Sequence, residues 1–170
     1  MTSSSTTYAT MPSPVGELVL ATQGAGLTHV EMPVHGAAPR REHTSAFDPG
    51  WRRDDALLAD ALGQLSEYFA GTRRTFELAL SPRGTPFQLK VWEALRAIPY
   101  GTTISYGELA ARIGNRNASR AVGLANGRNP IAIIVPCHRV VGAGGKLTGY
   151  GGGLDNKRVL LDLERSVVSG

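Results

Sequence analysis

Cysteine is almost absent from this sequence, whose one thiol belongs to Cys137. A single cysteine excludes an internal disulfide and any metal site built from several cysteines. We therefore predict no metal site, and no motif calls for an organic cofactor. Because a free thiol persists in a reducing compartment, the sequence also favours a cytoplasmic protein.

Long apolar runs are absent as well. No stretch approaches the roughly 20 apolar residues that a membrane-spanning helix requires, so we expect no membrane contact. The first ten residues, MTSSSTTYAT, contain neither the basic nor the apolar region of a signal peptide. We expect residues 1–10 to be a disordered tail.

Acidic residues are scarce in the second half of the chain. Residues 84–170 carry 11 Lys/Arg and 5 Asp/Glu, a balance of +6, whereas residues 1–83 carry 7 and 9, a balance of −2. Such an asymmetry is expected when one part of a protein faces a polyanion such as nucleic acid. A basic surface that is merely solvated is the alternative that charge alone leaves open.

Residues 1–83 have the pattern of a small α/β domain with an antiparallel sheet. Two strand-like runs, residues 18–21 and 27–31, flank a turn-rich segment. Asp54 is the expected N-cap of a helix with apolar residues at helical spacing, and residues 75–82 have the pattern of a further strand. No paired catalytic groups occur here, so we interpret this half as a scaffold.

Residues 84–170 are expected to form a helical domain. A capping box at residues 85–88 begins one helix, and Ser105 is the N-cap of a second. A short polar link then leads to a third helix, residues 118–127. Two short helices joined by a few residues are typical of a helix-turn-helix, here of the winged type.

Arginine is concentrated around this helical pair. Arg120 lies near the start of the later helix, where a recognition helix presents side chains to a groove. Small residues beside it would leave little bulk between the helix and a duplex, although they would equally allow two helices to pack closely. The residues expected at a DNA interface are Arg112, Arg116, Ala118, Ser119, Arg120, Ala121 and Gly123.

The only thiol follows a β-branched run, residues 131–135, which is typical of a strand buried on both faces. Pro136 cannot donate to a strand ladder, so Cys137 is expected at the end of that strand. A small core cysteine is the competing interpretation, since free cysteine is often buried. A thiol needs a nearby base or positive charge to ionise near neutral pH. His138 supplies a base, and Arg139 supplies either a field or structural support.

A histidine base works best when a third group orients it. Glu164 in the final predicted helix is the candidate, with Asp155 and Asp162 as rivals and a surface carboxylate as the plain alternative. Asp155 is also the expected cap of that helix. The glycine-rich residues 141–153 suit a loop that approaches a ligand closely, or a flexible surface loop.

The stretch IVPCHRVV, residues 134–141, resembles the active-site signature of the O6-alkylguanine-DNA alkyltransferases, also called methylated-DNA–protein-cysteine methyltransferases. The segments FQLKVWEALRAIPYGTTISYGELA and SRAVGLANGRNP precede it, and GKLTGYGGGLDNKRVLLDLE follows it, in the order and spacing of that family. The resemblance covers nearly all of residues 84–170 and is weaker in the first half. Some members hold a structural zinc with cysteines of the first domain, which this chain lacks.

The resemblance implies direct reversal of DNA damage. The partner would be double-stranded DNA containing O6-alkylguanine, bound through the minor groove by a monomer; O4-alkylthymine as a second substrate and cooperative binding are left open. The damaged base would be flipped out of the stack. The thiolate of Cys137 would then accept the alkyl group permanently, so that each molecule acts once.

The resemblance also assigns roles to residues by position. His138 would be the water-linked base for Cys137, oriented by Glu164. Tyr106 would donate toward the edge of the flipped base and crowd the 3′ phosphate. Arg120 would fill the gap that the base leaves in the stack.

Further positions would form the substrate pocket. Asn129 would brace the turn before the thiol, and the carbonyls of Cys137 and Val140 would accept from the guanine amino group. Tyr150 and the backbone near Gly151 would cover the pocket. The residues expected in or around it are Asn129, Pro136, Arg139, Val140, Tyr150 and Gly151.

Two other functions fit parts of the pattern. A cysteine hydrolase would use Cys137 and His138 but would need an oxyanion hole and repeated turnover. A DNA-binding module or damage sensor would use the helices alone; the alkyltransferase-like proteins of this kind lack the reactive cysteine, whereas Cys137 is present here. Stoichiometric self-alkylation distinguishes repair from both alternatives.

Overall fold

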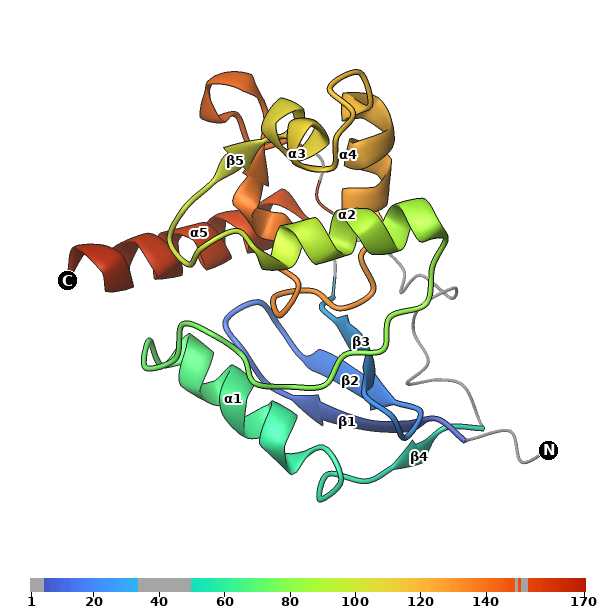
Figure 1. Ribbon diagram of the computed structural model, residues 1–170. Helices are drawn as coiled ribbons and strands as arrows, with labels where there is room; N and C mark the ends of the chain where they lie inside the picture. Colours follow the sequence, from blue (N-terminus) through green and yellow to red (C-terminus); the bar gives the residue numbers. More distant parts are fainter. Residues whose placement is uncertain (1–4, 34–49, 149, 151–152) are drawn as a thin grey trace.

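The computed structural model describes residues 5–33, 50–148, 150 and 153–170 (Figure 1). The first half contains a sheet and one helix, and helices dominate the second half (Figure 1). This mixed architecture confirms the predicted fold class.

Three antiparallel strands form the centre of the first half. β1 (Thr7–Met11), β2 (Leu18–Thr22) and β3 (Leu27–Glu31) pair in the order of the sequence. β4 (Arg52–Arg53) adds to β1 in parallel, which gives the order β3-β2-β1-β4. α1 (Ala59–Phe69) lies alongside the sheet and contributes to the same core (Figure 1).

Three predictions for the first half were wrong. α1 begins after Leu58 and not after Asp54, whose carboxylate accepts from the Leu57 N–H at 3.0 Å in a turn before the helix. The tail expected over residues 1–10 is not disordered throughout, because Thr7–Met11 pairs along its whole length with β2. The strand expected at residues 75–82 is reduced to a single bridge between Leu27 and Leu80. The proline that closes this segment cannot donate to a ladder, which limits the pairing.

Helix caps fix where the helices of the second half begin. α2 (Pro86–Arg96) starts with the predicted capping box: the Thr85 hydroxyl accepts from the Gln88 backbone N–H at 3.1 Å, and the Gln88 side chain accepts from the Thr85 N–H at 3.0 Å. α3 (Tyr106–Arg112) follows Ser105, whose hydroxyl accepts from a backbone N–H of the first turn. Such a cap contributes about 1 kcal/mol.

The remaining helices complete the second half. α4 (Ser119–Gly127) follows α3 after a short link, and the two helices pack against each other (Figure 1). α5 (Leu154–Ser169) is capped by Gly153 and not by Asp155, which lies exposed in its first turn and was predicted as the cap. The φ of 93° at Gly153 explains this difference, because glycine adopts that backbone region readily.

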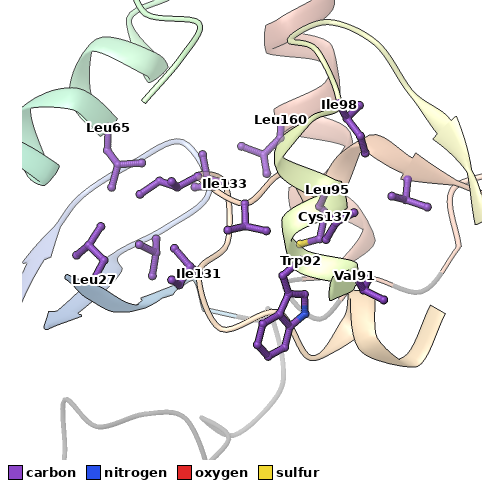
Figure 2. Packing of buried hydrophobic residues seen from close by; sticks show 14 of the residues in the cluster. Leu27, Leu65, Val91, Trp92, Leu95, Ile98, Ile131, Ile133, Cys137 and Leu160 are labelled. Atoms are coloured by element: carbon purple, nitrogen blue, oxygen red, sulfur yellow. The ribbon is translucent and has the colours of Figure 1, made fainter. Parts of the chain in front are cut away.

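The apolar run before the thiol is buried but is not a strand, contrary to the prediction. Only Ile131 forms a bridge, to Val30 of β3, after which the chain turns with Ile133 at a φ of 72°. The Asn129 side chain permits this turn by donating to the Ile131 and Val135 carbonyls and accepting from the Ile131 N–H. Figure 2 shows Ile131 and Ile133 in the core that the two halves share.

Candidate active site

Cys137 is the first residue of a short 3₁₀ helix, η2 (Cys137–Arg139), that directly follows the buried turn. It lies in the core beside Leu95 of α2 (Figure 2) and is only 5% exposed. The predicted position at a strand end is therefore wrong, since the turn replaces the strand. Burial alone would suit a core cysteine, so the polar groups around the sulfur decide between the two interpretations.

Three polar side chains act on this sulfur. Burial raises the pKa of the Cys137 thiol, whereas the nearby polar groups of Asn129 and Tyr150 and the positive charge of Lys157 act to lower it. The raised pKa leaves the thiol protonated near neutral pH, so that a base is required for reaction. A purely structural core position would gain nothing from a buried cation, which is costly to desolvate. These surroundings indicate a reactive site.

Glu164 of α5 fixes the neighbouring histidine. His138 Nε2 lies 2.6 Å from Glu164 Oε2, and both side chains are essentially inaccessible to solvent. The two rival carboxylates lie elsewhere: Asp155 is exposed at the start of α5, and Asp162 pairs with Arg165 at 3.5 Å on the surface. Of the three candidates, Glu164 is the one that reaches the histidine.

Electrostatics indicate which nitrogen of His138 carries the proton. Burial acts to raise the pKa of Glu164, but the hydrogen bond from His138 and the hydrogen bonds and positive charge of Arg139 outweigh it and hold that pKa well below its usual range. Burial lowers the pKa of His138, against the hydrogen bond and charge of Glu164. A neutral imidazole has one N–H, which Nε2 donates to the carboxylate. Nδ1, without a hydrogen-bond partner among the described residues, then keeps its lone pair.

Arg139 supports the same carboxylate. Its Nε donates to Glu164 Oε1 at 2.8 Å and its Nη2 to Oε2 at 3.1 Å, while Nη1 donates to the Ile98 carbonyl at 2.8 Å. A two-pronged contact of this kind fixes the plane of a carboxylate. Of the two roles that the sequence left open for Arg139, the geometry indicates structural support.

Sequence reasoning missed Lys157 of α5. Its buried Nζ donates to the carbonyls of Val140 and Thr148 at 2.6 and 3.2 Å and lies 5.8 Å from the centre of the Tyr150 ring. The Val140 carbonyl was predicted to accept from guanine, and it already accepts from Lys157. The available signal was a lysine one turn before Leu161, on the side of the helix that faces the core.

Tyr68 of α1 was missed too. Its hydroxyl donates to Glu164 Oε2 at 2.6 Å, and the backbone N–H of Gly101 donates to Oε1 at 3.1 Å. A tyrosine within the apolar face of a predicted helix was the available signal, because a buried phenol needs a hydrogen-bond partner. Nothing in the local sequence indicated which partner that would be.

A small parallel sheet connects the thiol region to the helix-turn-helix. β5 (Ile104–Ser105) pairs with β6 (Val140–Val141), so Tyr106 at the start of α3 lies close to the residues after η2. The half-buried Tyr106 donates from its hydroxyl to the Thr148 carbonyl at 3.3 Å. A Cβ added to Gly123 of α4 would lie 3.7 Å from the Tyr106 ring, an ordinary van der Waals distance, so α4 and Tyr106 are close neighbours and an alanine would fit there.

The predicted DNA-facing residues lie on α3, on α4 and on the link between these helices. The exposed residues are Arg112, Arg116, Arg120 and Ala121, and the half-buried ones are Ala118, Ser119 and Gly123. Within the described part of the chain, no hydrogen bond or ion pair engages the Arg120 guanidinium. The basic side chains of this surface are thus available to a ligand.

Metal ligands do not cluster in the part of the chain that the structure describes, where no group of three or more His, Cys, Asp or Glu side chains could hold an ion. None of the helices described is long and apolar enough to cross a membrane. Pro136, predicted beside the pocket, is buried next to the thiol. Gly151, predicted over the pocket, lies outside the described residues.

Both halves of the chain match models of one protein family. Residues 86–166 match the DNA binding domain of 6-O-methylguanine DNA methyltransferase, and residues 6–82 match its ribonuclease-like domain. The chain belongs to the 6-O-methylguanine DNA methyltransferase family. The resemblance noted in the sequence is confirmed.

Similar proteins agree along almost the whole chain. The methylated-DNA–protein-cysteine methyltransferase of Mycobacterium tuberculosis (strain ATCC 25618 / H37Rv) is 54% identical over 159 residues, which cover 94% of this chain and 92% of the relative. The protein of the same name from Methanosarcina acetivorans is 50% identical, with 94% and 98% covered. The crystal structure of Mycobacterium tuberculosis OGT in complex with DNA has a TM-score of 0.84 at 53% identity and covers 95% of this chain and 94% of that one.

Proposed function

We propose that this protein repairs alkylated DNA by transferring the alkyl group from the O6 atom of guanine to Cys137, once per molecule. The observation that carries the proposal is the 2.6 Å contact between His138 and Glu164 directly beside the only thiol of the chain. That contact gives the histidine the tautomer in which Nδ1 can accept a proton. Membership of the family, together with the names of the relatives, gives the class of reaction.

The proposed chemistry begins with removal of the thiol proton. His138 Nδ1 accepts it through a bridging water, and the resulting imidazolium is stabilised by ionised Glu164. The Cys137 thiolate attacks the alkyl carbon, the sulfur–carbon bond forms, and the bond between that carbon and O6 breaks with its electron pair left on guanine. Lys157 stabilises the thiolate by its charge. The thioether has no route back to a thiol, so the molecule is consumed.

The helix-turn-helix would bring the lesion to the thiol. We place α4 in the minor groove, with Arg112 and Arg116 at phosphates and Arg120 in the gap left by the flipped base. Tyr106 would donate to the edge of that base. The free thiol at the centre of this reaction suits a cytoplasmic location. We propose that the protein acts as a monomer.

Replacing Arg120 by alanine is expected to slow transfer from a duplex by roughly tenfold, because an unfilled gap costs about 1–2 kcal/mol of flipping energy. Transfer from a single-stranded oligonucleotide with the same lesion should hardly change, since no stacked gap forms there. Arg112→Ala is the matched control: it should weaken binding and its salt dependence without changing the ratio of the two rates. An equal loss of transfer rate on both substrates would show that Arg120 does not fill the gap in the stack.

Intact-mass measurement after incubation with an oligonucleotide containing O6-methylguanine tests the proposal as a whole. We expect each chain to carry one methyl group in place of the thiol hydrogen, a net gain of CH₂ located by peptide mapping on Cys137, and the oligonucleotide to contain guanine. Repeated product formation by unmodified protein would instead indicate a hydrolase. Binding without any change in mass would indicate a damage sensor.

A further inference from the structure

Tyr68 connects the first half of the protein to the machinery of the second. It lies on α1, is fully buried, and its ring contacts the rings of Phe69, Phe76 and Tyr100. Its hydroxyl donates to Glu164 Oε2 at 2.6 Å across 96 residues of sequence. The contact is as short as the one between Glu164 and His138.

The Glu164 carboxylate accepts hydrogen bonds from several donors. Oε2 accepts from the Tyr68 hydroxyl, from His138 Nε2 and from Arg139 Nη2, and Oε1 accepts from Arg139 Nε and the Gly101 N–H. Tyr68 and His138 therefore draw on the same oxygen. A donor added to a carboxylate oxygen weakens the hold of that oxygen on a neighbouring imidazolium.

We propose that Tyr68 is a positioning residue for alkyl transfer, whose hydroxyl holds Glu164 in place and limits how strongly Glu164 raises the basicity of His138. The first half then supplies part of the active site and is more than a scaffold. The inference deepens the proposed function and relies on it for the role of His138. The contact itself does not depend on which reaction the thiol performs.

Other charged groups act on the same pair, and none of them replaces Tyr68. Arg139 of η2 and Lys157 of α5 both favour the neutral form of His138 by their positive charge. Tyr100 lies near the carboxylate, and Arg74 lies 5.6 Å from the centre of the Tyr100 ring. The Tyr100 hydroxyl makes no hydrogen bond to Glu164 and is buried without a partner among the described residues.

The test compares Tyr68→Phe with Tyr100→Phe, two neighbouring phenols of which one touches the carboxylate. We expect Tyr68→Phe to move the titration midpoint of His138, followed by NMR of labelled histidine, to higher pH by about one pH unit. The acidic limb of Cys137 alkylation by iodoacetamide should move in the same direction, since His138 then stays protonated to higher pH. Tyr100→Phe should leave both midpoints at their wild-type values.

A second substitution keeps the test informative if Tyr68→Phe fails to fold. Site-specific 3-fluorotyrosine at position 68 keeps the ring and makes the phenol a stronger donor, so the His138 midpoint should move to lower pH. Midpoints that stay at the wild-type values in both Tyr68 variants would overturn the inference. Because iodoacetamide and NMR require no DNA, failure of methyl transfer from O6-methylguanine would count against the proposed function separately.

Discussion

Replacing Cys137 by serine is expected to reduce alkyl transfer below detection while DNA binding stays within about twofold of the wild type. A serine hydroxyl nearly matches the thiol in size, but its proton is far harder to remove, and a neutral alcohol is a poor nucleophile. His138 and Lys157 act on a thiolate and cannot ionise an alcohol to the same extent. The exposed arginines of α3 and α4 are unaffected. Intact mass and fluorescence anisotropy measure the two properties on the same sample.

The stability of Cys137→Ser serves as the control. Cys137 is 5% exposed and has polar side chains nearby, so the free energy of unfolding should fall by no more than about 2 kcal/mol. A folded variant without transfer would then isolate the nucleophile. Transfer that survives in the serine variant would place the nucleophile on another residue.

Glu164→Gln is expected to destabilise the protein by about 3–5 kcal/mol and to slow transfer by at least about 100-fold. Arg139 is 6% exposed and would lose the only carboxylate that the structure shows within its reach in the described residues. The glutamine NH₂ group would also point at hydrogen-bond donors, because the Glu164 carboxylate acts as an acceptor in each of its contacts. Urea denaturation measures the first effect, and single-turnover transfer under conditions where the variant is folded measures the second.

Asp162→Asn is the matched control on the same helix. Its carboxylate is exposed and pairs with Arg165 at 3.5 Å, an arrangement that contributes less than about 1 kcal/mol. We expect this variant to unfold and react as the wild type does. If the two amide substitutions behaved alike, the buried network would have no special role in either property.

The stabilising contributions of His138 and Glu164 should fall as the pH is lowered, in two ranges, whereas Glu31, whose pKa burial raises to about 8, contributes in the opposite direction. Folding lowers the pKa of both His138 and Glu164, so each stabilises the folded state above its unfolded pKa and ceases to do so as the pH falls. The loss of stability from His138 begins below its ordinary pKa of 6.5, because burial disfavours the protonated imidazole that the unfolded chain forms there. The loss of stability from Glu164 begins below its ordinary pKa of 4.5. Urea midpoints measured from pH 8 to 3 should show a loss below pH 4.5 in the wild type that Glu164→Gln lacks.

The starts of α2 and α3 could be predicted because a side chain acts within its own turn at each of them. Thr85 and Ser105 accept from N–H groups three residues ahead, so a short stretch of sequence contains the whole interaction. Residues 131–135 show the limit of such patterns. Their β-branched side chains indicate burial, but Asn129 satisfies the backbone in place of a strand ladder, and no periodicity reveals that substitution.

The site could be predicted only as far as the family resemblance extends. Spacing left Asp155, Asp162 and Glu164 as rival partners of His138, and the choice came from position in the family pattern. Tyr68 lies 96 residues from its partner, and contacts at such separations leave no trace in hydrophobic pattern. The contact of Lys157 could not be predicted for the same reason, since the Val140 carbonyl that it contacts lies 17 residues away in another element.

The order in which the chain is synthesised has a consequence for when this site forms. Domains fold from the amino end as synthesis proceeds, so α1 is in place long before α5 leaves the ribosome. Glu164 comes 26 residues after His138, and Lys157 arrives on the same helix. In a nascent molecule without α5, Cys137 therefore lacks both the Glu164 carboxylate and the Lys157 ammonium group. When α5 packs onto the rest of the protein, it brings both groups to the site together. The protein therefore becomes able to transfer alkyl groups late, and in a single step.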